Sequence, residues 1–176
     1  MSGFLIQERG LIARFVLILF LCAGMVYDLR KREIPASLTL GVLTGACAYA
    51  LFHALWIPVL LVAALLMASD LDLRSKWLAF AVTVTAAAFF IQPEIGLIAA
   101  FILLSWILWE CGYLGGADVK LLAAATLIFA TPLVLVPIAL LGGIQGVIAC
   151  LRRKREIPFV VSICSGSLLY FVQPYF

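Results

Sequence analysis

Long runs of apolar residues without a charged side chain constrain this chain more than any other feature. Charged residues gather instead in short clusters, of which the clearest are 28–33, 70–76 and 152–156. A charge inside a bilayer is costly, so charged clusters between apolar runs are typical of loops at a membrane surface. The pattern therefore predicts an integral membrane protein.

The composition points the same way. Of the 176 residues, 66% are hydrophobic and only 12% are charged, whereas soluble domains carry roughly 25% charged residues. The same numbers exclude a disordered chain, which would be rich in charge and poor in apolar residues. The length and the absence of a linker or repeat predict a single domain over 1–176. The net charge is only +3 and most of the basic residues lie in the clusters, which gives no basis for nucleic-acid binding.

Eight apolar segments can be marked off along the chain. A helix that crosses a bilayer needs about 20 residues, so the two segments of only 13 residues, 57–69 and 138–150, could instead be extensions of a neighbour. We therefore expect an all-α bundle of six to eight transmembrane helices, with eight favoured. The segments are 11–27, 37–56, 57–69, 77–91, 95–109, 121–137, 138–150 and 157–175.

The positions of Lys and Arg predict the orientation of this bundle. If all eight segments cross and the N-terminus is outside, the inside loops are 28–36, 70–76, 110–120 and 151–156. These loops hold every one of the 12 basic residues except Arg9 and Arg14. Because basic residues favour the cytoplasmic side, we expect the N-terminus outside and the clusters inside.

The cysteines and the histidine do not form a recognisable site. Four of the five cysteines lie in apolar runs, and no two are spaced C-x-x-C. We therefore expect small packing residues rather than a zinc or redox site. His53 is the single histidine, so a serine-histidine triad is not expected and no metal site is predicted.

Two aspartates lie at the predicted cytoplasmic rim. Asp28 follows the first apolar run and Asp118 precedes the run 121–137, so helix packing could bring them together. Two neighbouring carboxyl groups share one proton. One can then act as a general base toward water while the other hydrogen-bonds a scissile carbonyl, as in aspartic proteases. Asp70 and Asp72 lie beside basic residues and are expected in a solvated loop.

The residues around the two aspartates leave alternatives open. Gly115 and Gly116 permit unusual backbone conformations and close approach, so a substrate strand could lie against them. They could equally form a turn before a helix whose first turn favours an acid. Asp28 could be a rim charge paired with Arg30 or Arg32. Lys120 could assist Asp118 or simply anchor the rim.

The segment Asp28-Leu-Arg-Lys-Arg-Glu-Ile-Pro35 and the segment Gly115-Gly-Ala-Asp-Val-Lys120 resemble motifs of the type IV prepilin peptidases, which are membrane aspartic proteases of the GxGD group. Residues 155–159 resemble the late Ile-Pro-Phe segment of that family. The resemblance implies catalytic roles for Asp28 and Asp118. It implies supporting roles in the active-site loops for the residues Pro35, Gly115, Gly116 and Lys120.

The resemblance also implies a substrate and a location. The substrate is a prepilin-like protein whose short basic leader is removed at the cytoplasmic face, generally after Gly. The enzyme is a multi-pass protein of a prokaryotic cytoplasmic membrane, in contact with lipid, and it uses no cofactor or metal.

The chain departs from the family pattern in three respects. Ala36 stands where the family usually has Asn, and Ala117 where it usually has Gly. The cysteine-containing loop of the larger members is absent, so the chain is similar to the small Flp/Tad pilus or preflagellin peptidases, and methyltransferase activity is not supported. Two alternatives stay open: a small proton-coupled transporter, in which Asp28 and Asp118 relay protons, and a catalytically inactive scaffold of a pilus or secretion system.

Overall fold

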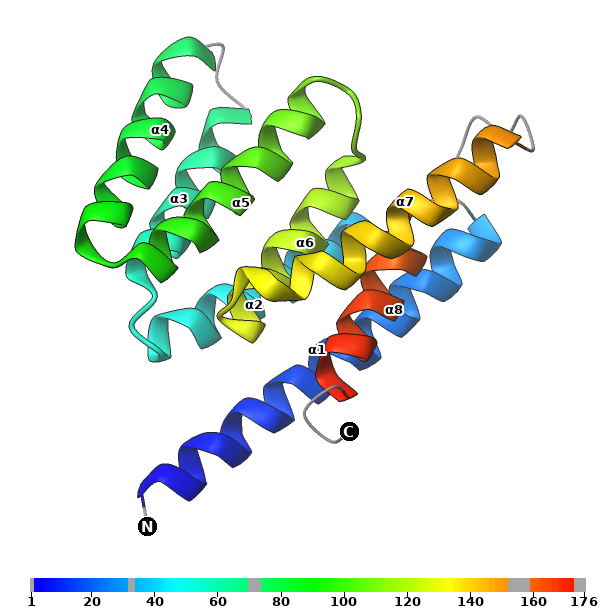
Figure 1. The fold of residues 1–176 in the computed structure, drawn as a ribbon, viewed down its shortest axis with the longest axis horizontal. Helices are drawn as coiled ribbons and strands as arrows, with labels where there is room; N and C mark the ends of the chain where they lie inside the picture. Colours follow the sequence, from blue (N-terminus) through cyan, green and yellow to red (C-terminus); the bar gives the residue numbers. More distant parts are fainter. Residues whose placement is uncertain (1, 32–33, 70–73, 152–158, 173–176) are drawn as a thin grey trace.

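The computed structural model describes residues 2–31, 34–69, 74–151 and 159–172. Within these ranges the chain is all-α, as predicted, and it forms eight α-helices, the favoured number (Figure 1). The helices are α1 (Ser2–Lys31), α2 (Ala36–Phe52), α3 (Trp56–Ser69), α4 (Arg74–Ile91), α5 (Pro93–Glu110), α6 (Gly116–Phe129), α7 (Leu135–Leu151) and α8 (Phe159–Val172), with a 3₁₀ turn, η1 (Pro132–Val134), before α7.

Helix α1 extends beyond both ends of the predicted segment 11–27. It has 30 residues, which corresponds to about 45 Å. Its last turn contains Arg30 and Lys31, whose positive charges interact favourably with the negative end of the helix dipole. Asp28 therefore lies on a helix, and the prediction that a loop begins at residue 28 was wrong.

The predicted boundary between segments 121–137 and 138–150 was also wrong. Helix α6 ends at Phe129, where Ala130 adopts a left-handed conformation with φ of 51°. The Leu133 backbone N–H then donates to the Thr131 hydroxyl at 3.3 Å, and Pro132 opens η1. Proline cannot continue a helix, so the chain turns here. An apolar run hides this break because Ala, Thr and Pro interrupt its hydropathy little.

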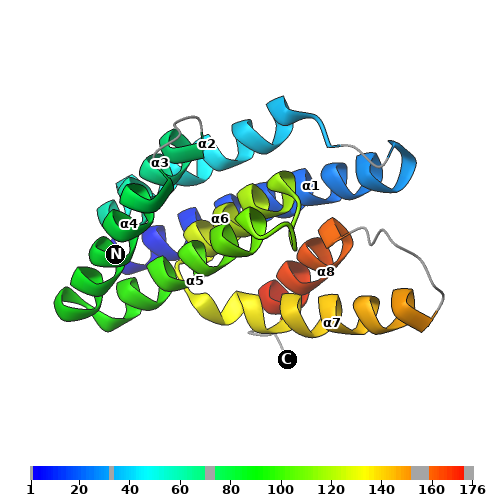
Figure 2. The same ribbon diagram turned by 90° about the horizontal axis from the view of Figure 1, so that it is seen from above.

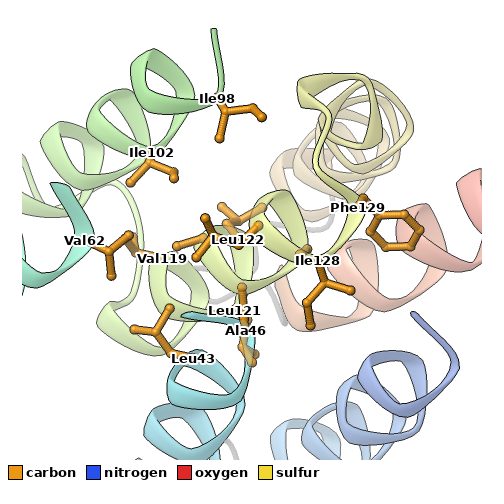
Figure 3. Packing of buried hydrophobic residues seen from close by; sticks show 14 of the residues in the cluster. Leu43, Ala46, Val62, Ile98, Ile102, Val119, Leu121, Leu122, Ile128 and Phe129 are labelled. Atoms are coloured by element: carbon orange, nitrogen blue, oxygen red, sulfur yellow. The ribbon is translucent and has the colours of Figure 1, made fainter. Parts of the chain in front are cut away.

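Helix α6 is the centre of the core. Val119 and all nine residues from Leu121 to Phe129 are buried. Figure 3 shows Leu43 and Ala46 of α2 on one side of α6 and Ile98 and Ile102 of α5 near it, and α1 and α8 also contact it. A helix that is apolar all round belongs in a core. Asp118 is thus carried by the most enclosed helix of the fold.

Helix α8 packs between α1 and α7 (Figure 2). A Cβ atom at Gly166 would lie 2.6 Å from the Ile138 backbone of α7, so only glycine permits this approach. On the other side, the Cys164 sulfur lies 3.5 Å from the Cys22 sulfur of α1. The cysteines whose side chains the structure describes, Cys22, Cys47, Cys111 and Cys164, are free thiols.

Within the part of the chain that the structure describes, two helical stretches are long and apolar enough to cross a membrane. They are Gly10–Lys31 and Pro93–Glu110. The test uses length and composition alone, which a signal sequence or a buried core helix of a soluble protein also satisfies. The other apolar helices are shorter, with 10 to 17 residues.

Candidate functional site

The structure brings Asp28 and Asp118 near enough for their charges to interact. Asp28 lies in the last turn of α1 and Asp118 in the first turn of α6, and these two helices contact each other. The Asp28 carboxylate is close enough to Asp118 to raise the pKa of the Asp118 carboxyl. Among the described residues, no ion pair joins Asp28 and Arg30.

The start of α6 holds the Asp118 side chain in place. Gly115 is the N-cap residue, so Asp118 is the third residue of the helix. The Gly115 backbone N–H donates a hydrogen bond to the Asp118 carboxylate, which is the reciprocal half of a capping box. A Cβ atom at residue 115 would lie only 2.9 Å from Asp118 Oδ2. Glycine is therefore needed here for the close approach of the carboxylate.

Burial dominates the electrostatics of Asp118, which precedes the apolar run of α6. The pKa of its carboxyl is raised from 3.8 to about 6, first by desolvation on burial and second by the Asp28 charge, while the hydrogen bond from Gly115 acts in the opposite direction. At neutral pH Asp118 is mostly ionised, and below pH 6 it is mostly protonated. Such a carboxyl can take up or release a proton near physiological pH.

We expect Asp28→Asn to lower the pKa of Asp118, because it removes one of the two causes that raise it. The pKa should stay above 3.8, since desolvation by burial remains. An infrared pH titration of the carboxyl band, assigned with Asp118→Asn, measures the midpoint directly. Asp72→Asn is the control and should leave the midpoint unchanged. An equal midpoint in Asp28→Asn and the parent would contradict the contact between the two carboxyl groups.

The second glycine of the motif serves a different contact. A Cβ atom at Gly116 would lie 3.2 Å from Nε1 of Trp109, and Trp109 itself stacks edge-on against Trp106 at 4.8 Å. Neither Gly115 nor Gly116 has a positive φ; the glycine that does is Gly112, at 79°. The expectation that unusual backbone conformations explain this glycine pair was therefore wrong. Both residues provide room for a neighbouring side chain instead.

The remaining predicted residues occupy distinct positions. Ala117 lies inside the first turn of α6 and is not one of the positive-φ residues, so this position does not require glycine for its conformation. Lys120 is two residues beyond Asp118 on the same helix, and residues at this spacing do not face each other. Pro35 is the N-cap residue of α2, and its carbonyl accepts hydrogen bonds from Leu38 and Thr39.

An apolar cavity lies next to the Asp118 turn, and the sequence analysis did not predict it. It has a volume of about 310 Å³ and is lined by α5, α6, α7 and the first residue of α8. Of its lining residues, Leu114 lies four positions before Asp118 in the chain and Leu122 lies four positions after it. The hydroxyl of Thr126 in its wall donates to a carbonyl of its own helix, so the cavity is suited to an apolar group.

Several predicted features lie outside the described residues. These are Arg32, the two loop acids Asp70 and Asp72, the basic cluster Arg152–Arg155, and the Ile157-Pro158 part of the late motif. Within the ranges that the structure does describe, no three His, Cys, Asp or Glu side chains are grouped so that they could hold a metal ion.

Comparison with known proteins found no similarity. No family model, no curated protein and no solved structure matches this chain.

Proposed function

We propose that this protein is a membrane-embedded aspartic endopeptidase that removes the short basic leader of prepilin-like proteins at the cytoplasmic membrane face. The electrostatic interaction between Asp28 and Asp118 carries the proposal. These acids are 90 residues apart in sequence and lie at the ends of two predominantly apolar helices that contact each other. The family resemblance of the segments around them supports the same assignment.

The surface of the bundle supports the membrane location. Large apolar side chains are exposed on every described helix except α6, which a soluble monomer of this size would not tolerate. Lipid would cover them, and the helices satisfy their own backbone hydrogen bonds, as a bilayer requires. Examples are Phe15, Phe20, Leu60, Met67, Phe80, Phe90, Leu104, Leu140, Ile144, Leu168 and Leu169.

The proposed reaction uses one proton shared by the two aspartates. The ionised carboxylate takes a proton from a water molecule, and the water oxygen attacks the scissile carbonyl carbon. The protonated carboxyl hydrogen-bonds the carbonyl oxygen and stabilises the charge that develops on it. The tetrahedral intermediate then breaks its C–N bond, and the leaving nitrogen takes up a proton from the pair. The raised pKa of Asp118 supports this role, because the monoprotonated pair must be populated.

The surroundings of Asp118 suggest where the substrate lies. A prepilin-like substrate presents its cleavage site next to its own apolar helix. We infer that apolar substrate side chains enter the cavity between α5, α6 and α7, within one helical turn of Asp118. The basic clusters of the enzyme, which would repel a basic leader, fix the orientation on anionic lipid instead.

Two parallel assays test the proposed function on the same reconstituted protein. A prepilin-like preprotein in the vesicles reports cleavage, and a pH-sensitive dye inside them reports proton movement. We expect cleavage without proton flux beyond that of empty vesicles. Proton flux that depends on Asp28 and Asp118, without cleavage, would contradict a peptidase and indicate a transporter.

The expected orientation of the helices in the membrane gives a separate prediction. A reporter fused after Phe176 should be outside and one inserted within Arg152–Arg155 should be inside, because all but two of the 12 basic residues would then be cytoplasmic. Alkaline phosphatase and green fluorescent protein fusions measure the two positions. A cytoplasmic Phe176 would contradict the eight-span arrangement.

A further inference from the structure

Arg14 is a cation in the apolar N-terminal half of α1, and no proposed activity uses it. It lies within the candidate span Gly10–Lys31. Its guanidinium carbon is 5.5 Å from the centre of the Phe129 ring of α6, and its Nε atom is buried without a hydrogen-bond partner among the described residues. An aromatic face stabilises a cation only in part, so a partly buried guanidinium at this depth favours a bound anion.

A second polar group lies beside Arg14. The Arg14 charge acts on the phenol of Tyr49 in α2. A Cβ atom at Gly10, one turn before Arg14, would lie 3.4 Å from the Tyr49 hydroxyl oxygen. Residues four apart share one face of a helix. The guanidinium and the hydroxyl therefore lie on the same side of α1, where one oxyanion can contact both.

An apolar furrow between α1 and α2 includes Tyr49 and the neighbour of Arg14, Ala13. The furrow has a volume of about 160 Å³ and is lined by Ala13 and Tyr49 near Arg14 and by Phe20, Gly41 and Gly45 farther along. A Cβ atom at Gly41 or at Gly45 would meet no atom within 4 Å. The two glycines thus leave an open channel on α2, and its apolar walls suit a hydrocarbon chain.

We propose that Arg14, Tyr49 and the α1–α2 furrow bind one anionic phospholipid in the outer leaflet. Its phosphate would contact the guanidinium and the hydroxyl, and an acyl chain would lie in the furrow. Arg14 precedes Asp28 by about 21 Å along α1, so the site is on the side of the membrane away from the aspartates. Charge complementarity favours an anionic lipid, because such a lipid brings a phosphate to the Arg14 guanidinium without a cationic group in its own headgroup.

This proposal rests on the membrane location but not on peptidase activity, so lipid retention is the readout. The full chain is purified from vesicles of phosphatidylglycerol and phosphatidylcholine, and native mass spectrometry counts the lipids that stay bound. Arg14→Gln should reduce phosphatidylglycerol retention at least about tenfold. Gly45→Leu should reduce it too by filling the furrow, and it should fold normally because leucine favours a helix more than glycine does. Gly143→Leu is the matched control on α7, where a Cβ atom also meets nothing within 4 Å.

The outcomes separate the parts of the proposal. Loss of phosphatidylglycerol in Arg14→Gln and Gly45→Leu, with full retention in Gly143→Leu, is the expected result. Retention equal to the parent in Arg14→Gln overturns the headgroup site, and retention in Gly45→Leu overturns the furrow as the chain site. Equal retention of phosphatidylcholine by the parent protein overturns the selectivity for anionic lipid. Loss of cleavage activity without loss of lipid would count against the proposed peptidase activity and not against the lipid site.

Discussion

Asp28→Asn and Asp118→Asn should each reduce leader cleavage by a factor on the order of 10⁴, which an assay would record as complete loss. An amide has nearly the shape of a carboxyl group but cannot accept a proton from water. Because the two groups share one proton and act as a unit, the double variant should be about as inactive as either single variant. Cleavage rates measured on one prepilin-like preprotein, with protein level and helicity checked for each variant, give the comparison.

The acids Asp70 and Asp72 are the matched controls for this experiment. The sequence places them in a loop on the same predicted side of the membrane, and we assign no chemistry to them. Asp70→Asn and Asp72→Asn should therefore cleave at the parental rate. Parental cleavage by Asp28→Asn or by Asp118→Asn would reject the two-aspartate mechanism.

Gly115→Ala should lower cleavage roughly 100-fold, the effect expected when a catalytic group is displaced by about 1 Å. The added methyl group would lie 2.9 Å from Asp118 Oδ2, so the carboxylate must move away from the Gly115 N–H. The backbone itself should tolerate alanine, since φ at this residue is −75°. The loss should therefore appear in kcat while the folded protein accumulates normally.

Gly143→Ala controls for the loss of a glycine as such. A Cβ atom there contacts nothing within 4 Å, so both cleavage and stability should match the parent. If Gly115→Ala cleaved as fast as Gly143→Ala, the position of the Asp118 carboxylate in this structure would not be the one that matters for catalysis.

The sequence predicted the all-α fold and the positions of the two aspartates near helix ends, because charge and hydropathy determine both. A bilayer or an apolar core excludes Asp28 and Asp118 from the middle of their segments, so each had to lie at a helix end. Their lateral contact could not be predicted in the same way. It depends on α1 packing beside α6, and nothing local in either segment encodes which helices become neighbours.

The errors in the sequence-based predictions have a common physical cause. The hydropathy of a segment says little about its tertiary contacts or about the conformation of a single residue. The break after Phe129 depends on one left-handed residue, Ala130, followed by a proline, inside a run that is apolar throughout. Gly116 gives room to the Trp109 ring, which no pattern around the glycine indicates. The apolar cavity beside Asp118 likewise exists only after α5, α6 and α7 have packed.

The most direct measurement of the central claim is the mass of the product after incubation with a prepilin-like preprotein. The substrate should carry a short basic leader that ends in Gly and is followed by an apolar helix. The purified wild-type chain in lipid should produce one new N-terminus, directly after that Gly, and the Asp28→Asn/Asp118→Asn double variant should produce none. An intact preprotein after incubation with folded wild-type protein, at pH values on both sides of the Asp118 pKa of about 6, would contradict the account.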